Sequence, residues 1–286
     1  MKITGHTRLL ALFGSPVVHS GSPAMYNYSF EKLGLDYVYV AFDVDKNGLK
    51  EAVSAARLYN MRGFNLTMPC KNEVLHYIDE LSPEARLVGA VNTVVNENGR
   101  LIGYNTDGTG FIKNLEAHKI DIKNKKIAVA GAGGAATAIV VQLALEGAGE
   151  IHIFNRKSET FNKMVETAKR LRQEVSEVVI ELYDILDEAK FNLLIKEAEI
   201  FVNATAAGMK PYDEESVIKD ISVFHKDLVV ADVVYNPIET KLLKEAGRAG
   251  CTCIDGKGML LWQGVYAFKL YTGKDMPVED VRSKFF

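Results

Sequence analysis

The 286-residue chain is poor in the residues and segments that mark several protein classes. Its three cysteines, Cys70, Cys251 and Cys253, are too few for a disulfide framework or a zinc ligand set, so no metal is expected. No apolar run approaches the roughly 20 residues that cross a bilayer. The apolar run at 9–14 is too short for the core of a signal peptide. We therefore expect a cytoplasmic protein that does not associate with membranes.

Neither sign of charge dominates the sequence. The chain has 34 Lys and Arg against 37 Asp and Glu, which gives a formal net charge of -3. Nucleic-acid binding needs a clustered basic surface, and no block of Lys and Arg is present, so we expect no nucleic-acid partner. Because 48% of the residues are hydrophobic and the charge is balanced, the composition is that of a folded protein with one large domain or two smaller ones.

Short apolar runs alternate with amphipathic stretches of ten or more residues, and this alternation predicts an α/β fold. The strands predicted for the first half cover residues 9–14, 37–44 and 63–68, followed by a hairpin over 92–105 that turns at Asn98-Gly99. Helix starts are predicted at Ser22-Pro23, Ser82-Pro83 and Thr106-Asp107, with the serines as N-caps.

The second half begins with a strand, a glycine-rich turn and a helix. Further strands are predicted at 150–156, 178–184, 199–206, 227–235 and 251–255. Such a run of βαβ units predicts a parallel sheet of the Rossmann type. We expect a substrate-binding and catalytic domain at 1–110, a dinucleotide-binding domain at 111–256, and C-terminal helices at 257–286 that return to the first domain.

The glycine-rich turn fits the pattern G-x-G-x-x-G/A of dinucleotide-binding folds. Gly131 permits the tight turn, Gly133 lets the backbone approach a pyrophosphate, and Ala136 allows close packing of helix on strand. The predicted cofactor contacts in this turn are Gly131, Ala132, Gly133, Gly134 and Ala135. An ordinary glycine-rich corner without a ligand is the alternative.

The strand that follows the turn ends in Asn155, Arg156, Lys157 and Ser158, all of which we predict to contact the cofactor. NAD-binding folds normally carry Asp or Glu here, which accepts hydrogen bonds from the ribose 2′-hydroxyl. Two cations without an acid suit a 2′-phosphate instead, so NADP is favoured and NAD remains possible. Alternatively, Arg156 and Lys157 are solvated residues at a helix start.

Seven short motifs occur in the order seen in shikimate dehydrogenases, and the chain resembles that family over nearly its whole length. The motifs are S-x-S-P (20–23), N-x-T-x-P-x-K (65–71), G-A-V-N-T (89–93), G-x-N-T-D-G (103–108), the glycine turn (131–135), N-R (155–156) and G-M-L-x-x-Q (258–263). The stretch at 258–264 is most similar to the quinate/shikimate dehydrogenase branch. The resemblance implies NAD(P)-dependent oxidation of shikimate or quinate to the 3-dehydro compound, in the pathway to chorismate and the aromatic amino acids.

The resemblance also implies roles for individual residues. Lys71 matches the catalytic lysine, and Asp107 matches its partner aspartate. The other positions that match substrate-binding residues are Ser20, Ser22, Thr67, Asn92 and Gln263. We assign further cofactor contacts to Thr205, Val234, Tyr235 and Gly256.

The chemistry of alcohol oxidation agrees with these roles. A cofactor takes the hydride, and a base must take the hydroxyl proton. Lys71 is predicted to lie in the first turn of a helix, and Asp107 opens another helix, so the two are interpreted as a coupled acid/base dyad. Taken alone, Lys71 could be a surface lysine and Asp107 an N-cap.

Several alternatives stay open from the sequence. A sensor that binds a dinucleotide without turnover is a rival function, although such a protein has no need of a base. A folate-linked dehydrogenase of similar build would need a flat aromatic slot, which the serines and amides do not suggest. The residues do not decide shikimate against quinate, and the oligomeric state, monomer or homodimer, is equally open.

Overall fold

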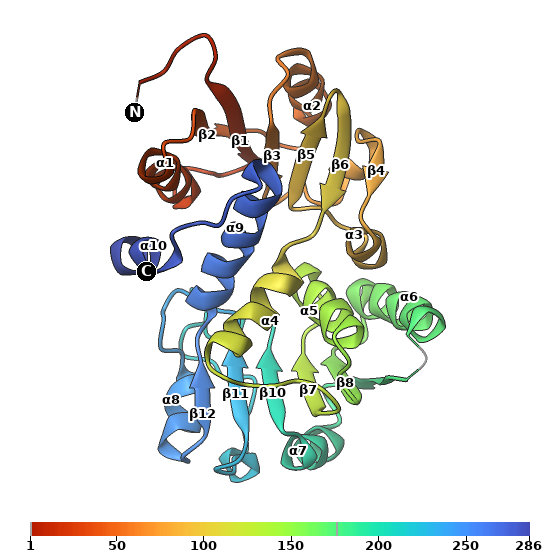
Figure 1. Cartoon of the computed structure of the whole chain (residues 1–286). Helices are drawn as coiled ribbons and strands as arrows, with labels where there is room; N and C mark the ends of the chain where they lie inside the picture. Colours follow the sequence, from red (N-terminus) through yellow and green to blue (C-terminus); the bar gives the residue numbers. More distant parts are fainter. Residues whose placement is uncertain (1, 176) are drawn as a thin grey trace. The chain divides into compact units, whose positions relative to one another are not determined.

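The computed structural model describes residues 2–175 and 177–286. These residues fold into two compact units: one contains the chain up to Thr106 together with Gln263–Phe286, and the other contains Asp107–Trp262. Both units are built from strands and helices, which confirms the predicted α/β class (Figure 1). The borders predicted at residues 110 and 256 separate a catalytic segment, a cofactor-binding segment and the C-terminal helices. The two compact units are defined by contacts and not by such roles, so these borders remain a prediction.

The first unit has a six-stranded mixed sheet with the order β2-β1-β3-β5-β6-β4. Its strands are β1 (Arg8–Gly14), β2 (Tyr37–Asp43), β3 (Gly63–Leu66), β4 (Glu80–Leu81), β5 (Thr93–Glu97) and β6 (Arg100–Tyr104). Its helices are α1 (Ser22–Leu33), α2 (Leu49–Leu58), α3 (Pro83–Val88) and α10 (Val278–Phe285), with one short 3-10 helix, η1 (Glu73–His76). Strands β1, β2 and β3 are parallel to one another, whereas β5 runs antiparallel to β3 and β6.

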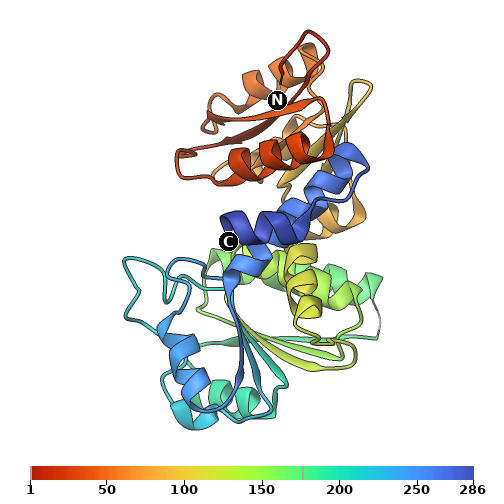
Figure 2. The ribbon, with the colours of Figure 1, turned by 60° about the vertical axis from the view of Figure 1, so that its left-hand side comes forward.

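The second unit has a six-stranded sheet, parallel throughout, with the order β12-β11-β10-β7-β8-β9. Its strands are β7 (Lys126–Ala130), β8 (Glu150–Asn155), β9 (Val179–Asp184), β10 (Ile200–Asn203), β11 (Val229–Asp232) and β12 (Thr252–Ile254). Its helices are α4 (Asp107–Ala117), α5 (Gly134–Leu145), α6 (Glu159–Glu174), α7 (Glu188–Glu197) and α8 (Lys241–Arg248), with the 3-10 helix η2 (Ile221–Val223). Helices lie on both faces of this sheet (Figure 2), which explains why β7, β10 and β11 are almost wholly apolar and buried.

Helix α9 (Gly256–Thr272) contains the second division between the units, because Trp262 belongs to one and Gln263 to the other. Neither α7 nor α8 is predicted from the sequence. Both are short, ten and eight residues, so each has too few turns for the repeating apolar pattern by which a helix is recognised. None of the helices in the described part of the chain has the length and apolar content needed to cross a bilayer.

Two predicted local features of the first unit are confirmed and one is wrong. The hairpin turns at Asn98-Gly99, where both residues have positive φ, 56° and 93°. The Ser82 side chain caps α3 by accepting a hydrogen bond from the Ala85 N–H. Ser22 is not an N-cap: α1 starts at this residue, its N-cap is Gly21, and no side chain caps it. The Ser20 hydroxyl accepts a bond from the Ser22 N–H instead, at 3.3 Å.

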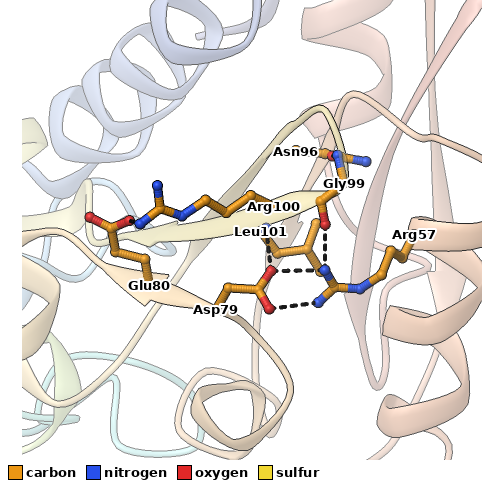
Figure 3. Close-up of polar contacts among 7 residues, drawn as sticks. All are labelled: Arg57, Asp79, Glu80, Asn96, Gly99, Arg100 and Leu101. Atoms are coloured by element: carbon orange, nitrogen blue, oxygen red, sulfur yellow. Dashed lines mark hydrogen bonds and ion pairs between the residues drawn. The ribbon is translucent and has the colours of Figure 1, made fainter.

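An arginine of α2 fixes the tip of the hairpin. Arg57 forms two hydrogen bonds with the Asp79 carboxylate, at 2.8 and 3.3 Å, and donates to the Gly99 carbonyl in the turn (Figure 3). The same carboxylate accepts a bond from the Leu101 N–H, 2.7 Å away. Arg57 and then this N–H lower the pKa of Asp79, because both interactions favour the charged carboxylate.

A second arginine joins α9 to the sheet. Arg62, just before β3, donates to the carbonyl oxygens of Tyr271, Asn96 and Leu270, at 2.6, 2.8 and 3.3 Å. Two of these carbonyls belong to the last turn of α9, where carbonyl groups have no partner within the helix. The guanidinium therefore caps α9 and ties it to the end of the hairpin.

Replacing Arg62 with Met should lower the free energy of unfolding by about 2 kcal/mol, because three hydrogen bonds to a charged donor are lost while the aliphatic stem is kept. Urea denaturation monitored by circular dichroism measures the change. Arg100→Met is the matched control, since Arg100 makes an exposed ion pair with Glu80 and should cost no more than about 0.5 kcal/mol. Equal losses in the two variants would contradict the role of Arg62.

Candidate active site

The carboxyl ends of β1 and β3 lie side by side because the two strands are parallel. β1 ends at Gly14, where a Cβ atom would lie 2.2 Å from the Cγ2 atom of Thr67. Glycine is therefore required at this strand end for Thr67 to take its half-buried place after β3. The Thr67 N–H donates to the Phe13 carbonyl at 3.0 Å, which holds the two strand ends together.

Lys71 lies in the turn that follows β3, and the predicted helix start at this position is wrong. The nearest helical segment is the single-turn η1, which begins at Glu73. Proline at position 69 and the buried Cys70, whose thiol donates to the Val44 carbonyl at 3.3 Å, shape the turn instead. The Lys71 carbonyl accepts a bond from the Val91 N–H at 2.8 Å, so the backbone of Lys71 lies beside the segment that leads to Asn92.

Asn92 is buried and connects the start of β5 with the segment that precedes α4. Its Oδ1 atom accepts bonds from the Thr106 N–H at 2.9 Å and from the Thr93 hydroxyl at 3.0 Å. Its amide nitrogen lies 3.0 Å from the Thr106 hydroxyl. Thr106 directly precedes Asp107, the first residue of α4. Asn92 thus fixes the backbone from which Asp107 projects.

Hydrogen bonds link the buried side chains of Tyr39, Asn65 and Thr93, none of which is assigned a role from the sequence. The Tyr39 hydroxyl donates to the Asn65 Oδ1 atom at 2.9 Å and is also hydrogen-bonded to Ser22. Asn65 donates to the Thr93 hydroxyl at 3.0 Å and to the Asn92 carbonyl at 3.1 Å. Asn65 could have been found as the first residue of the N-x-T-x-P-x-K motif, whereas Tyr39 reads as an ordinary strand residue.

Gln263 belongs to the same unit through the packing of α9 on α1. The next residue, Gly264, accepts a bond at its carbonyl from the Tyr26 hydroxyl at 3.0 Å. A Cβ atom on Gly264 would lie 2.5 Å from the Cε atom of Met25, so the two helices approach closely here. Gln263 therefore lies next to the helix that Ser22 opens.

The first unit thus collects most of the predicted substrate residues: Ser20, Ser22, Thr67, Lys71, Asn92 and Gln263. They supply hydroxyl groups, amides and one ammonium group, which suits a small polyhydroxylated ligand with a negative charge. Asp107 belongs to the second unit and is joined to the first by its peptide bond to Thr106. Among the residues that the structure describes, no three His, Cys, Asp or Glu side chains are grouped so as to hold a metal ion.

In the second unit, a turn that contains Gly131, Gly133 and Gly134 joins β7 to α5, and we call this turn the cradle. Gly131 has a φ of +116°, and a Cβ atom there would lie 2.5 Å from the Ala204 carbonyl oxygen. Gly133 and Gly134 have nothing within 4 Å of the place that a Cβ atom would take. The N-cap of α5 is Gly133, and no side chain occupies its first N–H groups, so a pyrophosphate fits this end of the helix.

The end of β8 presents two exposed cations and an uncharged network. Asn155 donates to the Arg156 carbonyl at 2.9 Å and to the Ser158 hydroxyl at 3.3 Å. Ser158 caps α6 by accepting a bond from the Phe161 N–H. Arg156 and Lys157 are exposed, so both side chains are free to face a phosphate group.

Of the remaining predicted cofactor residues, Thr205 follows β10, Val234 and Tyr235 follow β11, and Gly256 opens α9 after β12. Thr205 is held by Asn203, whose Oδ1 atom accepts from its N–H at 3.1 Å and from its hydroxyl at 2.7 Å. Val234 is buried and Tyr235 is half exposed. A Cβ atom on Gly256 would lie 2.5 Å from the Val233 carbonyl oxygen, so these segments are in contact.

Three family profiles match the chain in succession. Residues 12–94 match the shikimate dehydrogenase substrate binding domain, 114–242 match shikimate / quinate 5-dehydrogenase, and 256–284 match the shikimate 5′-dehydrogenase C-terminal domain.

Individual relatives match over the whole chain. The shikimate dehydrogenase (NADP(+)) of Listeria monocytogenes serotype 4b is 46% identical over 285 residues, which cover 100% of this chain and 98% of the relative. The quinate/shikimate dehydrogenase of Escherichia coli O139:H28 is 46% identical and covers 99% and 98%. A crystal structure of shikimate 5-dehydrogenase from L. monocytogenes, in complex with shikimate and NAD, superposes with a TM-score of 0.97 at 46% identity, covering 100% and 99%.

Gly133→Ala should weaken dinucleotide binding about tenfold or more, because the methyl group fills the space that the backbone leaves for a phosphate. The free energy of unfolding should fall by no more than about 1 kcal/mol, since alanine fits the extended backbone and loses only N-cap preference. Isothermal titration with NADP and urea denaturation measure the two effects.

Gly131→Ala is the comparison variant, because its Cβ atom collides with the Ala204 carbonyl and its φ disfavours any side chain. This variant should lose stability as well as affinity, by about 2 kcal/mol or more. An unchanged NADP affinity in a folded Gly133→Ala protein would show that the cradle does not hold the cofactor.

Proposed function

The chain belongs to the shikimate dehydrogenase family, and we propose that it catalyses the reversible NAD(P)-dependent oxidation of shikimate to 3-dehydroshikimate. This places it in the pathway to chorismate and the aromatic amino acids. The observation that carries the proposal is the polar cluster, by which we mean the predicted substrate residues that belong to the first unit, together with the cradle before α5 in the second unit. A dinucleotide sensor without turnover would need no such cluster.

We assign substrate binding to the residues that the first unit collects. Ser20 and Ser22 supply hydroxyl groups for the substrate carboxylate, and the Ser22 hydroxyl is hydrogen-bonded to Tyr39. Thr67, Asn92 and Gln263 supply groups for the ring hydroxyls. Quinate is the second candidate substrate, because it differs from shikimate by a hydroxyl group on the carbon that bears the carboxylate, and a quinate/shikimate dehydrogenase is among the 46% identical relatives.

Lys71 and Asp107 are proposed to act as a joint acid/base dyad. Oxidation releases the proton of the substrate's secondary hydroxyl, which the dyad accepts, and reduction returns it to the oxygen of the ketone. Lys71 is fixed through its backbone bond to Val91, and Asp107 through its peptide bond to Thr106, which Asn92 holds. The proton is assigned to the pair rather than to one member.

NADP is the proposed cofactor, with NAD as an alternative. When bound, it supplies the acceptor for the hydride. The cradle at Gly131 and Gly133 would hold its pyrophosphate, and Arg156 and Lys157 would face the 2′-phosphate. Contacts of Thr205, Val234, Tyr235 and Gly256 with the cofactor are part of the same proposal, and so are a cytoplasmic location, a monomeric or homodimeric state and the absence of a nucleic-acid partner.

Lys71→Ala should lower kcat for shikimate oxidation about a thousandfold, because the proton of the hydroxyl group loses its acceptor. NADP affinity should stay within twofold of the wild type, since the lysine is not assigned to the cofactor. Steady-state kinetics and fluorescence titration measure the two quantities. Lys50→Ala, at an exposed position of α2, is the control and should change neither. Retained turnover in Lys71→Ala would refute the dyad.

Ser158→Asp should shift the cofactor preference toward NAD, lowering the ratio of kcat/KM for NADP over NAD about tenfold or more. Aspartate keeps the N-cap of α6, repels a 2′-phosphate and accepts from a 2′-hydroxyl. Ser158→Ala loses the cap without adding charge, so it should lower stability and leave the ratio unchanged. If the wild type already prefers NAD strongly, the proposed role of Arg156 and Lys157 is wrong.

A further inference from the structure

A carboxylate without any assigned role is buried at the end of β11. Asp232 is 2% exposed and accepts three hydrogen bonds. Its Oδ1 atom accepts from the Asn203 amide and from the Val234 N–H, both at 3.0 Å. Its Oδ2 atom accepts from the Thr240 hydroxyl at 2.7 Å. Asn203 and Thr240 are themselves fully buried, so the network is closed to solvent.

This carboxylate joins the loops that follow β10 and β11. Asn203 connects Asp232 to the loop that follows β10. Its Oδ1 atom accepts hydrogen bonds from the N–H and the hydroxyl of Thr205, and its amide nitrogen donates to the Ala207 carbonyl at 3.1 Å. Thr240 marks the far end of the second loop, where its hydroxyl caps α8. Asp232 therefore fixes residues 203–207 and both ends of 232–240.

The two loops lie on one side of the switch point of the sheet. The strand order reverses between β7 and β10, and in parallel sheets ligands bind outside the strand ends at this point. The adenosine of a dinucleotide goes to the end of β8, on the other side of β7. If the chain binds NAD(P) as proposed above, the nicotinamide half extends over the loops that Asp232 holds.

Burial raises the pKa of Asp232 to about 6, above its ordinary value of 3.8. A carboxyl group whose pKa is higher in the folded state stabilises the fold most when protonated, and this contribution is lost as the pH rises through about 6. At pH 8 the ionised group thus lowers stability relative to a neutral one. Retaining a charge that lowers stability is typical of residues with a functional role.

We propose that Asp232 is a positioning residue that sets the geometry of the nicotinamide subsite, acting through Asn203 and Thr240 on the two loops. The inference rests on the proposed NAD(P)-dependent function. An asparagine at 232 keeps one acceptor oxygen and loses the acceptor for the Thr240 hydroxyl, so the loop at 232–240 is released on one side.

The test compares Asp232→Asn with the wild type at pH 8, using two probes. NADP contacts both sides of the switch point, whereas adenosine 2′,5′-bisphosphate contacts the adenosine side alone. We expect Asp232→Asn to raise the Kd and KM for NADP about tenfold, with the Kd for the bisphosphate and the KM for shikimate within twofold. The Tm should change little, because the removal of a buried charge offsets the lost acceptor of the buried Thr240 hydroxyl.

Three further variants complete the experiment. Thr240→Val removes the hydroxyl and should repeat the loss of NADP affinity, and Thr240→Ser keeps it and should restore binding. Asp220→Asn, at the exposed cap of η2, is the matched control and should not change NADP binding.

Two results would overturn the proposal. One is wild-type NADP affinity in Asp232→Asn. The other is a lower Tm with equal weakening of both probes, which indicates a purely structural role. Failure of the wild type to bind either probe would instead refute the proposed cofactor, so the two failures are distinguishable.

Discussion

Parallel pairing of neighbouring strands is the constraint on which both candidate sites depend. Because β1 pairs with β3, and β7 pairs with β8 and β10, the carboxyl ends of these strands meet at one edge of each sheet. Small residues at that edge, such as Gly14 and Gly131, let neighbouring segments approach within contact distance. The chemistry is therefore concentrated where regular structure ends.

Buried polar side chains then fix the loops that leave these edges. Asn92 does this in the first unit and Asp232 in the second, and each holds at least two separate segments. Burial makes such bonds costly to break, because a released donor or acceptor finds no water. Asp232 is proposed only to position its loops, whereas Asn92 is proposed both to position the backbone before Asp107 and to bind a ring hydroxyl, so positioning and binding roles need separate tests.

Much of the fold follows from the sequence, because apolar runs and turn residues act locally. The hairpin at Asn98-Gly99, the Ser82 cap and the all-parallel second sheet were all predictable in this way. Two local predictions are wrong, because the observed backbone differs from the one that the residue type favours. Serine is a favoured N-cap residue, but α1 includes Ser22 and its N-cap is Gly21. Pro69 lies in a turn rather than at the start of a helix, and the backbone of Lys71 is fixed by its hydrogen bond with Val91.

The sequence by itself determined the family and predicted the two kinds of site with their residue types, because short motifs at strand ends keep their order along the chain. The tertiary structure decided which side chains support them. Tyr39 lies 26 residues from Asn65, and Asp232 lies 29 residues from Asn203, yet each pair is hydrogen-bonded in the core. No local pattern marks such pairs, since their contact arises only when separate strands align in a sheet.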